Sequence, residues 1–218
     1  MNVSTAEATA KTESTPKTTW RTHRWTTAEF DAMVVSGYLR EGLKTFLWDG
    51  EIIEPMPENE PHVSAQDKLY RLLIGRLPEA DWTIRPAHPL VLKEGYKPQP
   101  DLVVLIEPRT DRRGRTPTAA DAALVIEIAD SSYAEDAGDK LPEYAAAGIP
   151  WYWIVNIGAR RIEVYSGPTV SSGVGQYTIR EDYPLEGAVP LILARGGESL
   201  AFGVVPVLEV LRDSLEDE

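Results

Sequence analysis

Two apolar segments, Pro100–Ile106 and Ala123–Ala129, constrain the fold of this chain more than any other feature. Each is a nearly continuous run of aliphatic residues, and such runs are typical of strands buried in the middle of a sheet. Each segment also carries one acid, Asp101 at the start of the first and Glu127 inside the second. A carboxylate among aliphatic neighbours is costly to bury without a partner, so both acids need an explanation.

The two acids can lie close together if the segments are neighbouring strands. Side chains alternate between the faces of a strand, so Asp101 shares a face with Val103, and Glu127 shares one with Val125. In register, the two carboxylates converge at one end of the sheet. Close carboxylates raise each other's proton affinity unless a cation lies between them, and a divalent ion such as Mg²⁺ or Mn²⁺ fits this need.

Lys140 follows Glu127 in the chain, at or just before the start of a predicted short helix in the segment "DKLPEYAAAG". Pro142 suits the first turn of this helix, and Gly148 suits its C-terminal cap. An ammonium near a metal can orient or deprotonate an attacking water and can neutralise charge on a phosphate. Metal, water and lysine together are the components of phosphodiester hydrolysis.

The other periodic patterns predict strands mixed with a few helices. They comprise a capped helix after Trp25, a hairpin turn at Asp49–Gly50, a helix over 62–77 and a strand pair around the turn 156–160. This order of elements indicates an α+β or mixed α/β fold.

Length and composition set the domain organisation. The 218 residues are 43% hydrophobic, which is enough for one well-buried core. We expect a disordered tail over 1–20, a single domain over 21–213 and an acidic tail over 214–218. There is no cysteine, which excludes a disulfide-linked partner. No apolar run approaches the roughly 20 residues of a membrane span, so we expect no membrane association and a cytoplasmic location.

The formal net charge of −12 repels nucleic acid at long range, so a nucleic-acid substrate requires a local basic surface. The long connection between the two apolar segments holds a basic concentration: Arg109, Arg112, Arg113 and Arg115. We hypothesise that this loop contacts a phosphate backbone. The alternative is a solvated, mobile loop.

Several motifs together resemble one known family. The segments "DGEI", "PDLVVL", "VIEIADSS" and "EYAAAGIPWYWIVN" look like the Uma-two family of restriction-endonuclease-like proteins, within the PD-(D/E)xK nuclease-like superfamily. The resemblance runs from about Trp25 to Leu211. It implies a restriction-endonuclease-like central mixed β-sheet flanked by helices, with β-hairpins, and a metal-dependent endonuclease acting on DNA.

The resemblance also assigns roles to single residues. Asp101 and Glu127 match the two metal-binding acids, and Lys140 resembles a displaced catalytic lysine, because the superfamily's usual lysine position is Ala129 here. Glu51 resembles the glutamate of the family's hairpin, which implies a role as an additional acidic ligand of the metal. His62 resembles a histidine that shapes the site or transfers a proton.

Each of these residues also has a purely structural interpretation. Asp101 could bind loop amides, Glu127 could pair with an arginine, and Lys140 could be solvated at a helix start. His62 could be a structural hydrogen-bond donor, and Asp136 and Asp139 suit helix capping better than metal binding.

Two functions follow from these alternatives. The first is a nuclease that uses Mg²⁺ or Mn²⁺ and has DNA as its substrate. The second is a non-catalytic module that keeps the fold and binds nucleic acid or protein, which the acidic charge favours. The direction of Lys140, toward the acids or into solvent, discriminates between them. We also expect a homodimer, because many nucleases cut two strands and the aromatic segment Trp151–Trp153 resembles an exposed surface. Such an aromatic cluster is more often part of the core or of a dimer contact than a platform for stacking bases.

Overall fold

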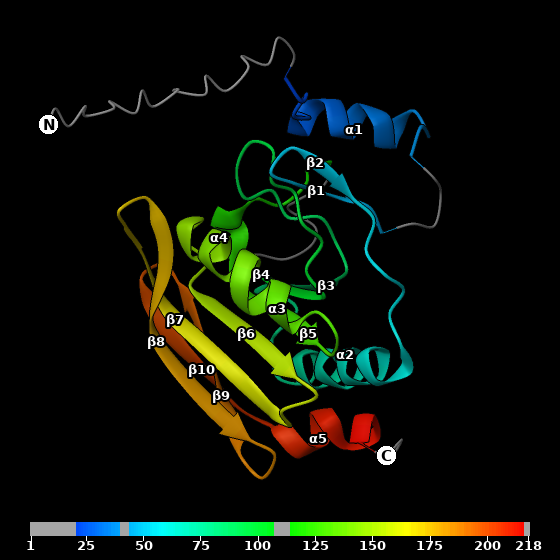
Figure 1. The fold of residues 1–218 in the computed structure, drawn as a ribbon. Helices are drawn as coiled ribbons and strands as arrows, with labels where there is room; N and C mark the ends of the chain where they lie inside the picture. Colours follow the sequence, from blue (N-terminus) through cyan, green and yellow to red (C-terminus); the bar gives the residue numbers. More distant parts are fainter. Residues whose placement is uncertain (1–20, 40–43, 107–113, 216–218) are drawn as a thin grey trace, which may run out of the picture.

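The computed structural model describes residues 21–39, 44–106 and 114–215 (Figure 1). The expected disordered tail over 1–20 lies outside the described residues. So do the last three residues of the expected acidic tail. At the start of that tail, the Ser214 hydroxyl donates to the Pro61 carbonyl at 2.7 Å, so chain packing continues past residue 213. The boundaries of the domain stay predictions.

A six-stranded mixed sheet forms the centre of the fold, in the order β3-β4-β5-β6-β7-β8. Four pairs are antiparallel, and β5 pairs with β6 in parallel. The strands are β3 (Trp82–Pro86), β4 (Leu102–Ile106), β5 (Ala122–Ala129), β6 (Trp151–Asn156), β7 (Arg161–Ser171) and β8 (Val174–Pro184). The expected mixed central sheet is therefore confirmed.

The parallel pair requires a crossover between β5 and β6, because a tight turn can join only antiparallel neighbours. This crossover contains α3 (Tyr133–Glu135), the π-helical turn η3 (Asp136–Lys140) and α4 (Leu141–Ala146). Gly148, with a φ of 76°, follows α4 in the left-handed conformation that glycine adopts at little cost. The crossover places Lys140 over the sheet, beside Glu127 of β5.

The remaining helices and hairpins lie outside the central sheet. The N-terminal part contains α1 (Thr27–Val35), the hairpin of β1 (Phe46–Trp48) and β2 (Glu51–Ile53), and α2 (Glu60–Ile74). The 3₁₀ turn η2 (Ala119–Asp121) precedes β5. The C-terminal part contains the hairpin of β9 (Ala188–Arg195) and β10 (Glu198–Pro206), followed by α5 (Val207–Leu211) and η4 (Arg212–Leu215). The predicted capping box of Thr26 and Glu29 is present at α1. Asn59, which was not predicted as a cap, caps α2.

The core has two parts, one on each face of the sheet. On one face, Leu102, Val104 and Ile126 pack with α2, α5 and the β9–β10 hairpin. On the other face, Val103 and Val125 pack with the crossover, and Figure 1 shows α3 and α4 covering that face. The alternation predicted for the two apolar strands is therefore present. Asp101 and Glu127 belong to the crossover face by the same alternation.

The aromatic segment that suggested a dimer interface is part of the core instead. Trp151, Tyr152 and Trp153 form the first half of β6, between β5 and β7. Tyr152 and Trp153 are buried, and Trp151 is half-buried. The expectation of an exposed aromatic surface here was wrong, because a strand in the middle of a sheet is covered on both faces. This segment therefore gives no support to a homodimer.

Candidate metal and catalytic site

Asp101 and Glu127 lie side by side at one end of the sheet. The antiparallel register pairs Leu102 with Ile126, so the preceding Asp101 lies next to the following Glu127. The Asp101 backbone N–H faces Glu127 Oε2 at an N···O distance of 3.4 Å. The N–H of Ile128 donates to Asp101 Oδ2 at 2.6 Å. Backbone pairing thus fixes both acids relative to each other.

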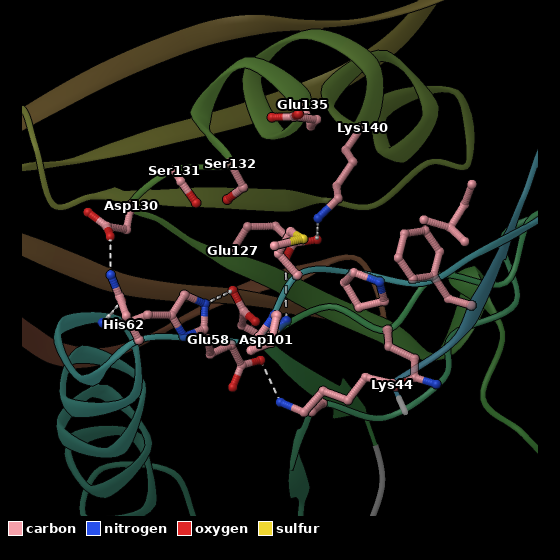
Figure 2. Close-up of a pocket in the computed structure, with 18 residues that line it drawn as sticks. Lys44, Glu58, His62, Asp101, Glu127, Asp130, Ser131, Ser132, Glu135 and Lys140 are labelled. Carbon is pink, nitrogen blue, oxygen red and sulfur yellow. Dashed lines mark hydrogen bonds and ion pairs between the residues drawn. The ribbon is translucent and has the colours of Figure 1, made fainter. Parts of the chain in front are cut away.

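The two acids open into a pocket of about 480 Å³ (Figure 2). The pocket lies between the N-terminal end of α2, the ends of β4 and β5, and the crossover. Six ionisable side chains of its wall matter below: Lys44, Glu58, His62, Asp101, Glu127 and Lys140. Such a concave site with convergent polar groups has the form of a ligand or active site.

Glu127 is almost completely buried, with 2% of its surface exposed. Its Oε1 accepts a hydrogen bond from the Tyr144 hydroxyl at 2.7 Å and lies 3.2 Å from Lys140 Nζ. Burial raises the pKa of Glu127 to about 8, with further contributions from the nearby carboxylates of Asp136 and Asp101. Lys140 and Tyr144 act in the opposite direction, because they stabilise the carboxylate.

Lys140 points toward the acids rather than into solvent, and its side chain is only 20% exposed. The ammonium also contacts Asp136 Oδ1 at 2.8 Å. Burial lowers the pKa of Lys140, but the carboxylates of Glu127 and Asp136 outweigh this effect and raise it overall. Lys140 is therefore not the solvated helix-start residue of the structural interpretation.

His62 lies on the opposite side of Asp101, at the first turn of α2. Its Nε2 is 3.1 Å from Asp101 Oδ2. Burial lowers the pKa of His62, but the hydrogen bond and charge of Asp101, together with Glu58, raise it overall. The sequence prediction of a site-shaping role is compatible with this contact.

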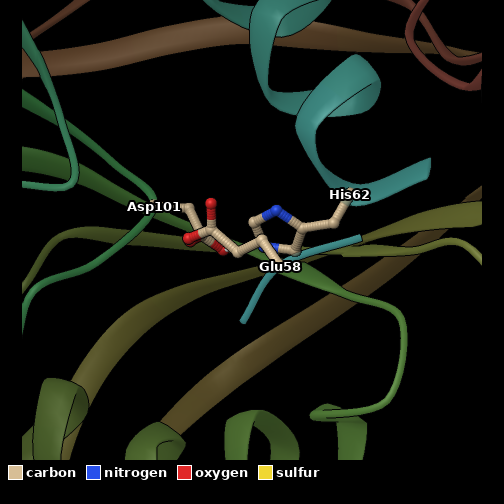
Figure 3. Close-up of side chains that lie close together, drawn as sticks. All are labelled: Glu58, His62 and Asp101. Carbon is tan, nitrogen blue, oxygen red and sulfur yellow. The ribbon is translucent and has the colours of Figure 1, made fainter. Parts of the chain in front are cut away.

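A further acid, Glu58, lies close to His62 and Asp101. Ligand atoms of Glu58, His62 and Asp101 all lie within 4.8 Å of one another (Figure 3). Glu58 also pairs with Lys44 at 2.5 Å. Carboxylate oxygens such as those of Glu58 and Asp101 are ligands that suit Mg²⁺ and Mn²⁺, and an imidazole that holds one of these carboxylates is a common outer partner. The residues around Asp101 thus fit a divalent cation.

Not every residue proposed from the sequence reaches this pocket. Glu51 is exposed on β2, where its carboxylate pairs with Arg24 at 2.8 Å, and it does not line the pocket. The hairpin that places Glu51 directs it toward the N-terminal segment instead. Arg115 makes two contacts with Asp121, at 2.6 and 2.9 Å. Arg109, Arg112 and Arg113 lie outside the described residues.

Four residues of the site were not identified from the sequence. Glu58 and Lys44 stand in loops that carry no periodic signal, although Glu58 and His62 have a spacing of one helical turn. Asp136 was interpreted as a helix cap, but it is 1% exposed and binds Lys140. Tyr144 lies in the motif "EYAAAGIPWYWIVN", whose pattern does not show that its hydroxyl reaches Glu127.

Comparisons with known proteins agree with this architecture. No curated protein matches the sequence. A crystal structure described as a "putative nuclease belonging to DUF820", from Anabaena variabilis, has a similar fold. The TM-score is 0.57 at 15% sequence identity, and the match covers 78% of this chain and 91% of that chain.

Two further findings concern the chain as a whole. Among the helices of the described residues, none is long and apolar enough to cross a membrane. The Uma2 (Uma-two) family, described as "Putative restriction endonuclease", matches residues 27–194. Because this match includes most of the sequence together with both acids, the histidine and the lysine of the pocket, the chain belongs to the Uma2 family.

Proposed function

We propose that this protein is a metal-dependent endonuclease that hydrolyses phosphodiester bonds in DNA. The observation that carries the proposal is the contact of Lys140 Nζ with Glu127 Oε1 at 3.2 Å, beside Asp101 in one pocket. A buried lysine and two neighbouring acids are costly to assemble for stability alone. Membership of a family described as "Putative restriction endonuclease" supports the same reaction.

A divalent cation, Mg²⁺ or Mn²⁺, would be held by Asp101 and Glu127. Ligand atoms of Glu58 and His62 lie within 4.8 Å of the Asp101 carboxylate. When bound, such an ion supplies Lewis-acid activation of water and neutralises charge on the phosphate. Glu51, which the family resemblance suggested as a ligand, pairs with Arg24 and is left out of this donor set.

Lys140 and His62 act on either side of the acids. The Lys140 ammonium orients the attacking water and stabilises the negative charge that develops on the phosphate oxygens. His62 holds Asp101 through Nε2 and shapes that wall of the pocket. Together these groups position water and phosphate, which is the main requirement for displacement at phosphorus.

Contacts with the DNA backbone require exposed cations in the pocket wall or beside it. Lys44 stands in the pocket wall with 45% of its side chain exposed. We assign the remaining backbone contacts to Arg109, Arg112, Arg113 and Arg115. Replacement of all four arginines by alanine should reduce the salt dependence of DNA binding, because each lost phosphate contact lowers the number of released counterions. A homodimer would supply one site to each DNA strand, and light scattering measures its mass directly.

The direct test is nicking of plasmid DNA with Mg²⁺ or Mn²⁺. Wild type should nick DNA, whereas Asp101→Asn and Lys140→Ala should be at least about 100-fold slower. Asp67→Asn, an exposed acid on α2, serves as the matched control. Equal nicking by all four proteins would indicate a contaminating nuclease. DNA binding without cleavage under every metal condition would favour the non-catalytic binding module.

A further inference from the structure

Lys140, the lysine of the proposed nuclease site, lies in a different element from the one that the superfamily pattern uses. The position two residues after Glu127, where the superfamily pattern has its lysine, is Ala129, whose side chain is buried. Lys140 instead belongs to the crossover between β5 and β6, at the end of the π-helical turn η3. Turns of this kind are rare and occur often at functional sites. The contact of Lys140 with Glu127 therefore depends on the groups that hold this turn against the sheet.

Asp136, at the start of η3, makes three contacts that fix the turn. Its carboxylate binds Lys140 Nζ at 2.8 Å and accepts the Ser132 hydroxyl at 2.7 Å. Its backbone carbonyl accepts the Tyr152 hydroxyl from β6 at 3.0 Å. Asp136 is thus attached to the sheet through its carbonyl and to Lys140 through its carboxylate. This arrangement sets the position of the ammonium relative to β5.

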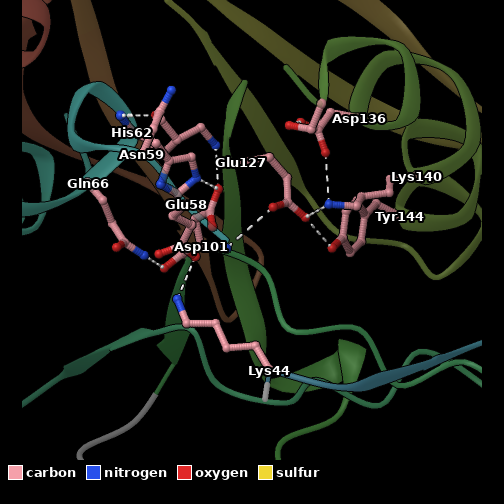
Figure 4. Close-up of polar contacts among 12 residues, drawn as sticks. Lys44, Glu58, Asn59, His62, Gln66, Asp101, Glu127, Asp136, Lys140 and Tyr144 are labelled. Carbon is pink, nitrogen blue, oxygen red and sulfur yellow. Dashed lines mark hydrogen bonds and ion pairs between the residues drawn. The ribbon is translucent and has the colours of Figure 1, made fainter. Parts of the chain in front are cut away.

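Tyr144, one turn after Lys140, fixes the other side of the contact. Its buried hydroxyl donates to Glu127 Oε1, the same oxygen that Lys140 approaches. Oε1 is therefore occupied by two donors. Oε2 is left on the side of Asp101, whose backbone N–H lies 3.4 Å away. Figure 4 shows Glu127 between these two groups, with Tyr144, Lys140 and Asp136 on one side and Asp101 on the other.

We infer that Asp136 and Tyr144 are positioning residues of this site, which hold the Lys140 ammonium and turn Glu127 Oε2 toward Asp101. The inference rests on the proposed function, since it assigns Oε2 of Glu127, the oxygen that faces the Asp101 backbone N–H, to the cation. Asp136 and Tyr144 are buried, with 1% and 0% of their surfaces exposed, so neither is open to a substrate. Asp136 acts through Lys140, and Tyr144 acts through Glu127.

The two residues should therefore affect different measurements. Asp136→Asn removes the charge that holds the ammonium, so kcat should fall about 10-fold to 100-fold while the Kd for Mn²⁺ and KM change little. Tyr144→Phe removes the donor to Oε1, so the Kd for Mn²⁺ should rise about 10-fold. A purely structural role would lower the stability of both variants without this division.

Two matched controls are available, one in the same turn as Asp136 and one on β8. Asp139→Asn changes an exposed acid of the same turn, and Tyr177→Phe removes a hydroxyl that donates to the Ile149 carbonyl, away from the acids. Both controls should keep wild-type values. The Kd for Mn²⁺ is measured by calorimetry, and cleavage is measured with a short DNA duplex. Crystal structures of Asp136→Asn and Tyr144→Phe give the distance between Lys140 Nζ and Glu127 Oε1.

The outcomes separate this inference from the proposed function. If Asp136→Asn and Tyr144→Phe match their controls in Kd and kcat, the inference is overturned and the nuclease proposal stands. If wild type neither binds Mn²⁺ nor cleaves DNA, the nuclease proposal fails, and the crystal structures decide the positioning. The positioning inference is overturned if Lys140 Nζ and Glu127 keep their positions in both variants. It is supported if either group is displaced.

Discussion

Asp101 is tied to the neighbouring strand by Ile128, whose backbone N–H donates to Oδ2 of the carboxylate at 2.6 Å. The same oxygen lies 3.1 Å from His62 Nε2. A backbone donor within a sheet is rigid, and it remains when a side chain is replaced. Asp101 should consequently keep its position in variants of His62, which allows the role of His62 to be tested separately.

Replacement of His62 by alanine should slow DNA cleavage about 10-fold to 100-fold, the range found when an outer partner of a metal ligand is lost. The fold should persist, because Ile128 still holds Asp101. His88→Ala is the control, since His88 is exposed and contacts only the Pro86 carbonyl among the interactions of the described residues. Cleavage rates and circular dichroism of the three proteins check this prediction. A rate equal to wild type in His62→Ala would remove His62 from the site.

Glu58 and Glu51 give a direct comparison between the structure and the family resemblance. Ligand atoms of Glu58, His62 and Asp101 lie within 4.8 Å, whereas Glu51 pairs with Arg24 outside the pocket. Glu58→Gln should therefore raise the Kd for Mn²⁺ about 10-fold, and Glu51→Gln should leave it unchanged. Titration calorimetry with Mn²⁺ measures both constants. The reverse order would restore Glu51 as a ligand and exclude Glu58.

The position of the two acids was predictable from the sequence because it depends on local rules. Alternation along the strands and antiparallel pairing place Asp101 beside Glu127, and these rules apply to any buried pair of strands. The hairpin at Asp49–Gly50 and the capping box of α1 follow equally local signals. The central strands and the first helices were therefore recognisable before any coordinates.

The partners of the acids were not predictable, because they depend on how distant segments pack. The π-helical turn that aims Lys140 at Glu127 has no sequence signal, and Asp136 looks like any helix-capping acid. The segment Trp151–Trp153 was misread because its composition does not show whether both faces of a strand are covered. The pairing of Glu51 with Arg24 was not predictable either, because a hairpin is easy to recognise, whereas its direction relative to the body is set by tertiary contacts.

The close approach of β8 to the crossover gives a prediction about packing. A Cβ atom at Gly175 would lie 2.0 Å from the Pro142 carbonyl oxygen and 2.3 Å from the Ala146 nitrogen. Gly175→Ala must therefore push α4 and the attached Lys140 away from the sheet. We expect a loss of about 1–3 kcal/mol in the free energy of unfolding, together with slower DNA cleavage.

Gly138→Ala is the matched control for Gly175→Ala. Gly138 lies in the π-helical turn, and a Cβ atom there would meet nothing within 4 Å. This substitution should leave stability unchanged or raise it by up to about 1 kcal/mol, because alanine loses less backbone entropy. Urea denaturation of both variants measures the difference. Equal stability of the two variants would show that the contact at Gly175 relaxes at no cost.

Stability at low pH should depend on Glu163, a carboxylate on β7 with 0% of its surface exposed. Its oxygens accept hydrogen bonds from Tyr133, Tyr165 and Arg161 at 3.1, 2.8 and 2.9 Å. Burial raises the pKa of Glu163, but the hydrogen bonds from Tyr165, Arg161 and Asn156, with the charge of Arg180, outweigh it and lower the pKa below its ordinary value of 4.5.

A carboxyl whose pKa is lower in the folded state stabilises the fold fully above the unfolded pKa and loses that contribution as pH falls to the folded pKa. Glu163→Gln should therefore cost about 1–3 kcal/mol near neutral pH, where hydrogen bonds to a charged group are lost. The deficit should shrink as pH falls below 4.5, the ordinary value, because wild type then loses the same charge. Glu186→Gln, at an exposed position, should show no such trend. Denaturation curves from neutral pH to below pH 4.5 measure the difference in the free energy of unfolding between wild type and each variant. A deficit independent of pH would mean that the Glu163 charge does not stabilise the fold.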